Sequence, residues 1–170
     1  MREQLAKICG VYGASLSSSL LGIADPDGKP LDGARLLWAI SGCESSFGAN
    51  LKPRHEPAYD VGGEYSTHPP MPELLEKFGS AAACSYGPWQ ILFVNAPEGF
   101  RPSDFDDLQF AAQATTAFLG KLLRACRPTT LAEIASCWNA GHVQNPLSPG
   151  VARYAADLTR YYAEPLPAAS

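Results

Sequence analysis

The sequence predicts a single, mainly α-helical domain. Apolar residues recur at the three- and four-residue spacing of a helix face in several segments of the chain. These segments are bounded by capping residues, glycines and prolines, which mark where helices begin and end. With 170 residues, of which 46% are hydrophobic and 18% charged, the chain is long and apolar enough to bury a core. We therefore expect one domain over residues 1–170.

Two helices are expected in the first 48 residues. The first is indicated by apolar residues at helical spacing, Leu5, Ile8, Tyr12, Leu16 and Leu20. A turn cluster at 25–30 follows, after which Asp32 is placed to cap a second helix that runs through Glu44. Gly48 can end this helix, because glycine tolerates the left-handed conformation of a helix C-terminus.

Residues 50–72 interrupt the helical pattern. They include five prolines and a Gly62-Gly63 pair, and their apolar residues show no period. We expect a long irregular loop or a small β excursion near 59–66, and loops of this length are commonly functional. A short helix is then expected at 72–78, with Pro72 in its first turn and Gly79 at its end.

Two helices are expected between residues 104 and 141. Asp104 or Asp106 can open the longer one, whose buried face is marked by Leu108, Ala111, Ala112, Thr115, Leu119, Leu122 and Cys126. Thr130 and Glu133 then form a capping box before a second apolar run.

A last helix begins at Ser148-Pro149. Its apolar side consists of Val151, Tyr154, Ala155, Leu158 and Tyr162. Pro165 and Pro167 end this helix, so we expect residues 163–170 to fray.

The net charge of −4 argues against nucleic acid as a partner, because the few Lys and Arg residues are scattered rather than clustered. No segment resembles a membrane span. The first 24 residues resemble a signal peptide only faintly, since glycines and serines interrupt their apolar run and Glu3 stands in the charged region. We expect a monomer that is made in the cytoplasm without a clear export signal.

The cysteines show neither a disulfide framework nor a metal-ligand spacing. Five cannot all pair within one chain: Cys9, Cys43, Cys84, Cys126 and Cys137. Cys43 and Cys137 stand in apolar helical runs, where a thiol behaves as a small hydrophobe. We therefore expect reduced cysteines, no metal site and no cofactor.

Glu44 is the first candidate for chemistry. It stands near the end of an apolar helical run, Leu36-Leu37-Trp38-Ala39-Ile40-Ser41-Gly42-Cys43-Glu44. A carboxyl group that is buried with a helix face is costly to ionise, so it holds its proton toward neutral pH and can donate it to a leaving group. The residue type and its position fit the acid of a glycosidase.

Two later motifs extend this pattern: Ser85-Tyr86-Gly87-Pro88-Trp89-Gln90 and Cys137-Trp138-Asn139-Ala140-Gly141. The order Glu-Ser-x-Phe, Gly-x-x-Gln and Asn-Ala-Gly, followed by a helix that contains tyrosine, resembles the SLT-type lytic transglycosylases and goose-type lysozymes. The resemblance implies a lysozyme-like fold and cleavage of peptidoglycan strands at the β-1,4 bond between N-acetylmuramic acid and N-acetylglucosamine. Glu44 would protonate the glycosidic oxygen and then deprotonate the 6-hydroxyl of the sugar, which closes a 1,6-anhydro ring without water.

The resemblance also implies roles for Ser45 and Gln90. Ser45 matches the serine after the catalytic glutamate, which contacts the acid or the substrate; alternatively, its hydroxyl bonds its own backbone. Gln90 matches the Gly-x-x-Gln glutamine, and its amide can both donate to and accept from an N-acetyl group. Apolar neighbours predict that Gln90 is buried.

Two residues of the C-terminal part complete the implied groove. Asn139 would line the sugar groove, although it can also serve as a helix C-cap with Gly141. Tyr154 matches the late tyrosine that hydrogen-bonds the catalytic glutamate, and Tyr161 and Tyr162 compete for this role. Trp89 and Trp138 stand where transglycosylases commonly have Met and Tyr, which preserves apolar bulk but reshapes the sugar subsites.

The segment 50–83 is longer than the corresponding connection in most SLT domains. Goose-type lysozymes draw a second carboxylate from this stretch, and the candidates here are Glu56, Asp60 and Glu64. A hydrolase with such a carboxylate is therefore the alternative to a transglycosylase. A metal site formed by His55, Glu56, Asp60 and His68 lacks a recognised ligand spacing.

Two other classes of function stay open. Cys84 and the later Gly141-His142-Val143 resemble the cysteine and histidine of NlpC/P60-type peptidases, but the surroundings of His142 show no strand pattern. A domain that only binds glycan or forms part of a phage particle is the non-enzymatic alternative. Such a domain has no need of a buried acid, so Glu44 argues for an enzyme. Without an export signal, the enzyme would reach the cell wall by phage-type release or in a virion.

Overall fold

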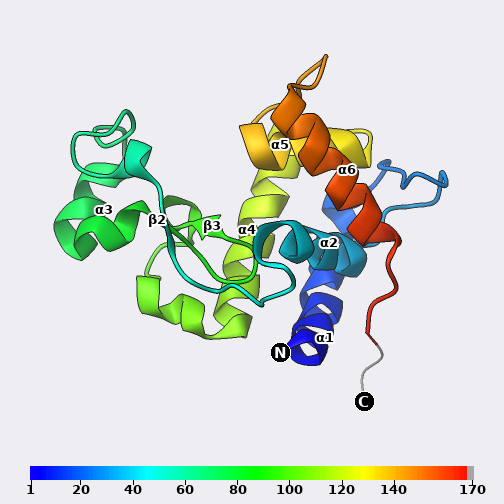
Figure 1. The fold of residues 1–170 in the computed structure, drawn as a ribbon, viewed down its shortest axis with the longest axis horizontal. Helices are drawn as coiled ribbons and strands as arrows, with labels where there is room; N and C mark the ends of the chain where they lie inside the picture. The colour runs from blue at the N-terminus through cyan, green and yellow to red at the C-terminus, as the bar shows by residue number, and fades with distance from the viewer. Residues whose placement is uncertain (168–170) are drawn as a thin grey trace.

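The computed structural model describes residues 1–167 as a mainly helical protein with one small sheet (Figure 1). Its α-helices are α1 (Arg2–Gly13), α2 (Gly33–Ser45), α3 (Met71–Phe78), α4 (Leu108–Cys126), α5 (Leu131–Ala140) and α6 (Pro149–Ala163). Strands β1 (Arg54–His55), β2 (Cys84–Tyr86) and β3 (Ile91–Leu92) form an antiparallel sheet in the order β1-β2-β3. The prediction of a mainly α chain is thus confirmed, and one strand of the small sheet, β1, lies within the segment 50–72 for which an irregular loop or a small β excursion was expected.

Helix α2 occupies the centre of the hydrophobic core. Residues 36–40 are at most 1% exposed, and α1 and α6 both pack against this helix. Helix α1 approaches α2 at Gly13 and Gly33, where a Cβ on either glycine would overlap backbone atoms of the other helix. This close crossing requires glycine on both sides, because any side chain would separate the two backbones.

The first predicted helix changes its winding partway. It is α-helical to Gly13 and continues as a 3₁₀ helix over Ala14–Leu20, although helical spacing predicted one continuous element. Leu5, Leu16 and Leu20 are nonetheless buried. The apolar face therefore persists across the change.

Helix α2 ends three residues earlier than predicted. Ser46 and Phe47 adopt left-handed conformations, with φ of 53° and 60°, and their N–H groups donate to the carbonyls of Gly42 and Ser41. This hydrogen-bonding pattern is a common way to satisfy the last carbonyls of a helix. This turn brings the Phe47 ring onto Trp38, with 4.4 Å between the ring centroids. Burial of the Phe47 ring against Trp38 favours ending α2 at this point.

The sheet lies elsewhere than the β excursion predicted near 59–66. Arg54 pairs with Ser85 and His55 pairs with Cys84, so β1 depends on a partner about thirty residues later in the chain. Residues 59–66 instead form turns, such as that closed by the Tyr65 N–H donating to the Ala58 carbonyl. A two-residue strand shows no alternation in sequence, which explains the misplaced prediction.

The predicted boundaries of the C-terminal helices hold with one correction. Asp107, not Asp104 or Asp106, caps α4, and its Oδ1 accepts from the N–H groups of Gln109 and Phe110. Asp104 instead accepts from the Arg101 N–H and so caps the preceding 3₁₀ helix, Pro102–Asp106. Thr130 caps α5 as predicted, but the predicted capping box is not complete, because the Glu133 carboxylate accepts from the N–H and hydroxyl of Thr129 rather than from the Thr130 N–H.

Helix α6 starts from the cap Ser148 and ends at Ala163, as the prolines beyond it predicted. Arg35 donates to the carbonyl of Tyr162 and so ties the end of α6 to α2. Residues 168–170 of the predicted frayed tail lie outside the described residues. Over residues 1–167, no helix combines the length and apolarity that a bilayer crossing requires.

The corrected cap of α4 yields a stability prediction. Asp107→Ala leaves two N–H groups of the first helical turn without their acceptor, so we expect the free energy of unfolding to fall by about 0.5–2 kcal/mol. Asp106→Ala is the matched control, since the exposed Asp106 does not cap the helix. Denaturant unfolding compares the two variants, and equal losses would show that α4 does not depend on this cap.

Candidate functional site

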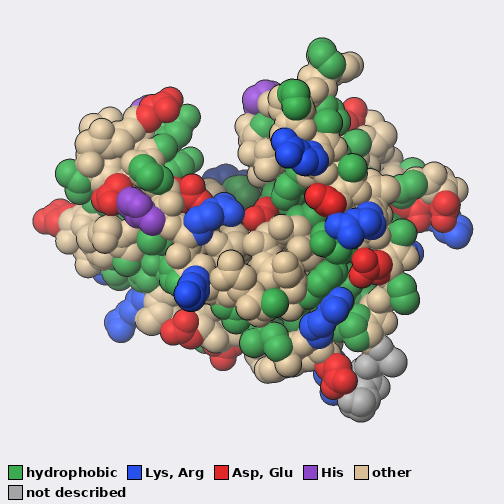
Figure 2. Space-filling model, in the orientation of Figure 1, with side chains coloured by type: hydrophobic (Ala, Val, Ile, Leu, Met, Phe, Trp, Pro, Cys, Tyr) green, Lys and Arg blue, Asp and Glu red, His purple; other side chains and the backbone are tan. Residues whose placement is uncertain are grey.

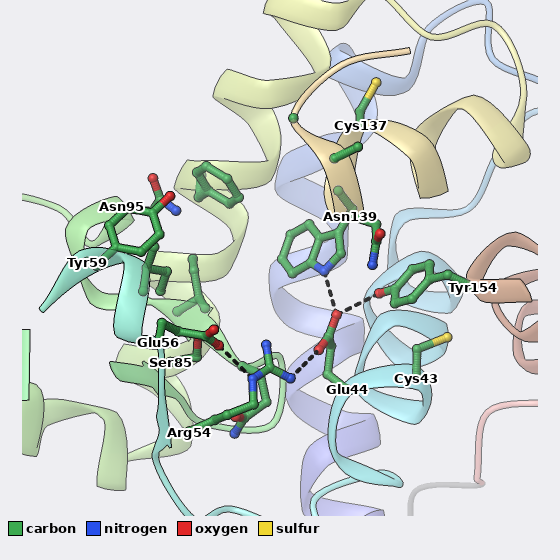
Figure 3. Close-up of a pocket in the computed structure, with 17 residues that line it drawn as sticks. Cys43, Glu44, Arg54, Glu56, Tyr59, Ser85, Asn95, Cys137, Asn139 and Tyr154 are labelled. Carbon is green, nitrogen blue, oxygen red and sulfur yellow. Dashed lines mark hydrogen bonds and ion pairs between the residues drawn. The ribbon is translucent and has the colours of Figure 1, made fainter. Parts of the chain in front are cut away.

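Glu44 lies in the last turn of α2 and faces a cavity of about 570 Å³. Figure 1 shows α3 and the sheet on one side of α4, and α5 and α6 on the other. The surface is hollowed between these two sides (Figure 2). Tyr59 and Asn95 line the cavity across from Glu44 (Figure 3), and Trp138 and Tyr154 line it on the α5 and α6 side.

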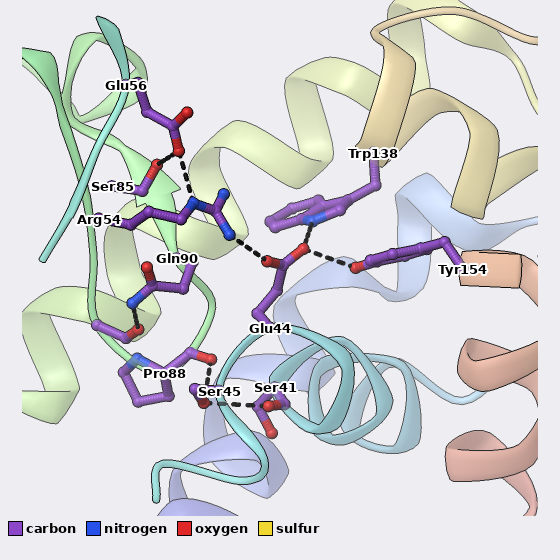
Figure 4. Close-up of polar contacts among 11 residues, drawn as sticks. Ser41, Glu44, Ser45, Arg54, Glu56, Ser85, Pro88, Gln90, Trp138 and Tyr154 are labelled. Atoms are coloured by element: carbon purple, nitrogen blue, oxygen red, sulfur yellow. Dashed lines mark hydrogen bonds and ion pairs between the residues drawn. The ribbon is translucent and has the colours of Figure 1, made fainter. Parts of the chain in front are cut away.

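The two oxygens of the Glu44 carboxyl group have different surroundings. Oε1 accepts hydrogen bonds from Trp138 Nε1 at 2.8 Å and from the Tyr154 hydroxyl at 2.9 Å. Oε2 faces Arg54, whose Nη1 lies 3.8 Å away. The Glu44 side chain is only 11% exposed, so the carboxyl group is largely shielded from water. One oxygen is thus fixed by two donors while the other points toward the cavity (Figure 4).

Burial raises the pKa of Glu44 above its ordinary value of 4.5, because removal from water disfavours the charged form. The hydrogen bonds from Trp138 and Tyr154 and the nearby Arg54 oppose this effect, while Glu56 adds to it. Burial also raises the pKa of Tyr154 well above 10, so its hydroxyl stays protonated and remains a donor. The result is a carboxyl group that holds its proton to higher pH.

Helices α5 and α6 position the two donors. Helix α5 starts at its Thr130 cap and places Trp138 one turn before the left-handed Gly141. The Trp138 ring packs edge-to-face on Phe118 of α4, with 5.7 Å between centroids, and this contact orients its N–H toward Glu44.

The hydrogen bond that the resemblance implies between Tyr154 and Glu44 is present. Tyr162, which competed for this role, is engaged elsewhere, because its hydroxyl accepts from the Asp32 N–H at 2.8 Å. Tyr161 packs its ring edge-to-face against Phe47, with 4.9 Å between centroids. Tyr154 is therefore the tyrosine of α6 that holds the carboxyl group.

Arg54 and Glu56 form the facing wall. Arg54 Nε donates to Glu56 Oε1 at 2.6 Å, and the hydroxyl of Ser85 donates to the same oxygen at 3.1 Å. The pairing of β1 with β2 places Arg54 opposite Ser85 and brings these groups together. One guanidinium group therefore stands between the carboxyl groups of Glu56 and Glu44.

Gln90 is buried, as predicted, and lines the cavity. It has a left-handed backbone, with φ of 44°, and its Nε2 donates to the Gly87 carbonyl at 3.0 Å. The turn that contains it is attached to α2, because Trp89 Nε1 donates to the Leu37 carbonyl at 2.8 Å. The position of Gln90 relative to Glu44 is therefore set by the core.

Ser45 is placed differently from the substrate contact that the resemblance implied. It is 2% exposed, and the described lining of the cavity does not include it. Its hydroxyl donates to the Pro88 carbonyl at 2.6 Å and accepts from the Gly48 N–H at 2.9 Å. The hydroxyl also donates to the Ser41 carbonyl, one turn back in α2, at 3.1 Å, which is the backbone bond expected as the alternative. We therefore assign Ser45 a structural role.

Asn139 lines the cavity and is exposed to it. It lies inside the last turn of α5, and the C-cap is Gly141, with φ of 77°. The predicted alternative, a C-cap role for Asn139, is therefore not its position in the structure. Its amide is available to a molecule in the cavity.

Of the three candidate second carboxylates, Glu56 alone is in the described lining. Asp60 accepts from His55 Nε2 and from the Val61 N–H, both at 2.7 Å, and these bonds fold the loop upon itself. Glu64 lies in the turns that follow, outside that lining. Within residues 1–167, no three His, Cys, Asp or Glu side chains come together as metal ligands.

The cysteine and histidine of the peptidase alternative have separate environments. The Cys84 thiol lies 3.5 Å from the Ser80 carbonyl, and burial raises its pKa, which disfavours the thiolate nucleophile. His142 Nδ1 lies 3.0 Å from the carbonyl of Ala140. Neither residue belongs to the described lining of the cavity.

Sequence reasoning missed two partners of Glu44. Trp138 was considered for its bulk and its effect on the sugar subsites but not as a donor to Glu44, although its place beside Asn139 is the signal that could have indicated one. Arg54 lies two residues before Glu56, which is a local signal for their ion pair, but its contact with Glu44 had no local signal, because a strand pairing across about thirty residues brings it to the site. Comparison of the chain with protein-family models, characterised proteins and solved structures returned no significant match. The geometry of the site is therefore the basis for its function.

The buried Glu44 predicts a pH-dependent stability difference. The unfolded chain releases the Glu44 proton near pH 4.5 and the folded protein at higher pH, so this group stabilises the fold below that range and loses its contribution as pH rises through the folded pKa. Glu44→Gln cannot ionise and escapes this loss. Urea unfolding should therefore show the variant gaining stability relative to the wild type from pH 4 to pH 8, and a constant difference would contradict the raised pKa.

Proposed function

We propose that the protein cleaves peptidoglycan strands at the β-1,4 bond between N-acetylmuramic acid and N-acetylglucosamine, as a lytic transglycosylase with Glu44 as its single catalytic carboxyl group. The observation that supports this most is the state of Glu44: a shielded carboxyl group with a raised pKa, at a cavity, with one oxygen held by two donors. A general acid needs a pKa near the working pH and an oxygen within reach of the leaving group. Burial moves the Glu44 pKa in the direction that such an acid requires, and its carboxyl group lines the cavity that would receive the glycan.

The same atoms fit the two steps of the reaction. Trp138 and Tyr154 hold Oε1, so Oε2 is the oxygen that would give its proton to the glycosidic oxygen. After the bond breaks, the carboxylate would take the proton of the 6-hydroxyl, whose oxygen closes the anhydro ring. The two donors stabilise the transient carboxylate, since hydrogen bonds to a charged acceptor are stronger than those to a neutral one.

The walls of the cavity also present groups that suit N-acetylated sugars. Gln90 and Asn139 present amides, which suit N-acetyl groups, and Tyr59 and Trp138 present aromatic surface for sugar rings. A helical chain with a small sheet beside the cavity is compatible with the lysozyme-like fold that the motifs imply.

A hydrolase is the second candidate, and Glu56 favours it. Glu56 lines the cavity and is separated from Glu44 by the Arg54 guanidinium. An inverting glycosidase places its two carboxyl groups about 6.5–9.5 Å apart, to leave room for the attacking water. In that reaction Glu56 would be the base that activates water.

Glu44→Gln tests the proposal directly. The amide retains the shape of the side chain but has no proton to donate, so we expect the rate of glycan cleavage to fall by about 10²–10⁴-fold. Turbidity loss of purified peptidoglycan measures this rate, and glycan co-sedimentation checks that binding persists. Glu76→Gln, on the exposed face of α3, is the matched control and should leave the rate unchanged. A variant that keeps a tenth or more of the wild-type rate, about 1.4 kcal/mol or less in barrier, would remove Glu44 from the acid role.

The products distinguish the two candidates. In water labelled with ¹⁸O, mass spectrometry of the wild-type products should show 1,6-anhydro ends without the label, and Glu56→Gln should retain cleavage. A hydrolase would instead give labelled reducing ends and would lose its turnover in Glu56→Gln. Products with cleaved peptides and intact glycan would contradict both candidates.

A further inference from the structure

Arg54 covers the Glu44 oxygen that is available for chemistry. Trp138 and Tyr154 occupy Oε1, whereas Oε2 faces Arg54 Nη1 at 3.8 Å. A general acid must come within about 2.6–3.2 Å of the atom that it protonates. The guanidinium group therefore lies on the approach to Oε2 from the β1 side of the cavity, and a glycosidic oxygen that takes this approach would displace it.

Arg54 is held more firmly by Glu56 than by Glu44. Arg54 Nε is 2.6 Å from Glu56 Oε1, which Ser85 also holds, so Glu56 is the firm anchor. The separation of 3.8 Å from Glu44 exceeds a hydrogen bond. The Arg54 side chain is 57% exposed, which screens its attraction to the Glu44 carboxyl group. An entering ligand can therefore break the Glu44 contact and leave the Glu56 contact intact.

We propose that Arg54 is a gate: it covers Glu44 Oε2 while the cavity is empty, and an entering glycan displaces it toward Glu56. This inference rests on the proposed function of Glu44 as a general acid. It makes Arg54 a positioning residue, since it acts through Glu44 rather than on the sugar.

Displacement of Arg54 would also change the acidity of Glu44. The titratable and polar groups that act on Glu44 are Trp138 from α5, Tyr154 from α6, and Arg54 and Glu56 from the β1 segment, while Cys43 adjoins it on α2. Arg54 is the cation in this set, and its proximity lowers the Glu44 pKa. When Arg54 withdraws, the pKa of Glu44 rises, so the carboxyl group holds its proton to still higher pH. Substrate entry therefore favours the protonated form of the acid.

The first test needs no substrate. We would follow the Glu44 side-chain carbon by NMR during a pH titration of the free protein, in the wild type, Arg54→Gln and Lys52→Gln. Arg54→Gln should shift the Glu44 titration to higher pH. Lys52→Gln removes the same charge from the same segment, but at an exposed residue outside the described lining of the cavity, and should leave the titration unchanged. Arg54→Met, which keeps the apolar stem, should reproduce the result of Arg54→Gln.

The second test compares two pH profiles of glycan cleavage. The profile of kcat/KM reports groups of the free enzyme, and that of kcat reports groups of the enzyme–substrate complex. Arg54→Gln should therefore move the alkaline limb of kcat/KM to higher pH and leave that of kcat unmoved, because the substrate has already displaced Arg54 in the complex.

The outcomes distinguish the gating role of Arg54 from the proposed function of Glu44 as a general acid. An unshifted NMR titration, or equal shifts in both profiles, would overturn the gate while cleavage itself continued. A shifted titration without any cleavage by the wild type would reject the proposed function, and the gating role with it.

Discussion

The burial of α2 is the constraint on which the site depends. Residues 36–40 are buried on every side of the helix, so rotating or sliding α2 would disrupt close packing all around it. Its last turn emerges from this packing at Glu44, which leaves the carboxyl group at the boundary between core and cavity. The apolar burial of the helix thus offsets the cost of shielding an ionisable group from water.

The same helix also sets the far side of the site. Trp89 donates to the Leu37 carbonyl and Ser45 donates to the Pro88 carbonyl, so the 87–90 turn is attached to α2 at two points. Gln90 belongs to that turn, which joins β2 to β3 in the hairpin. Trp89 and Ser45, which are buried outside the described lining of the cavity, therefore position Gln90, which lines it.

Local patterns in the sequence predict the helices well and long-range pairing poorly. The caps at Asp32, Thr130 and Ser148 were predicted because a cap is formed by residues within one turn of one another. The contact between Tyr154 and Glu44 was expected from the order of motifs. Strand β1 was misplaced and Arg54 was missed, because a two-residue strand is specified by a partner distant in the chain. For Ser45 both a substrate contact and a bond to its own backbone stayed open, because sequence does not show on which side of a helix end a hydroxyl lies.

The order of these residues along the chain has a consequence for biosynthesis. The donors to Glu44 Oε1 follow it by 94 and 110 residues. A ribosome releases the chain from its N-terminus, so α2 is exposed before α5 and α6 have been made. During that interval Glu44 lacks both donors and the walls that shield it, and it ionises as a solvated side chain does. The nascent chain therefore carries an ordinary carboxylate, and the weak acid of the folded protein arises only when its last helix docks.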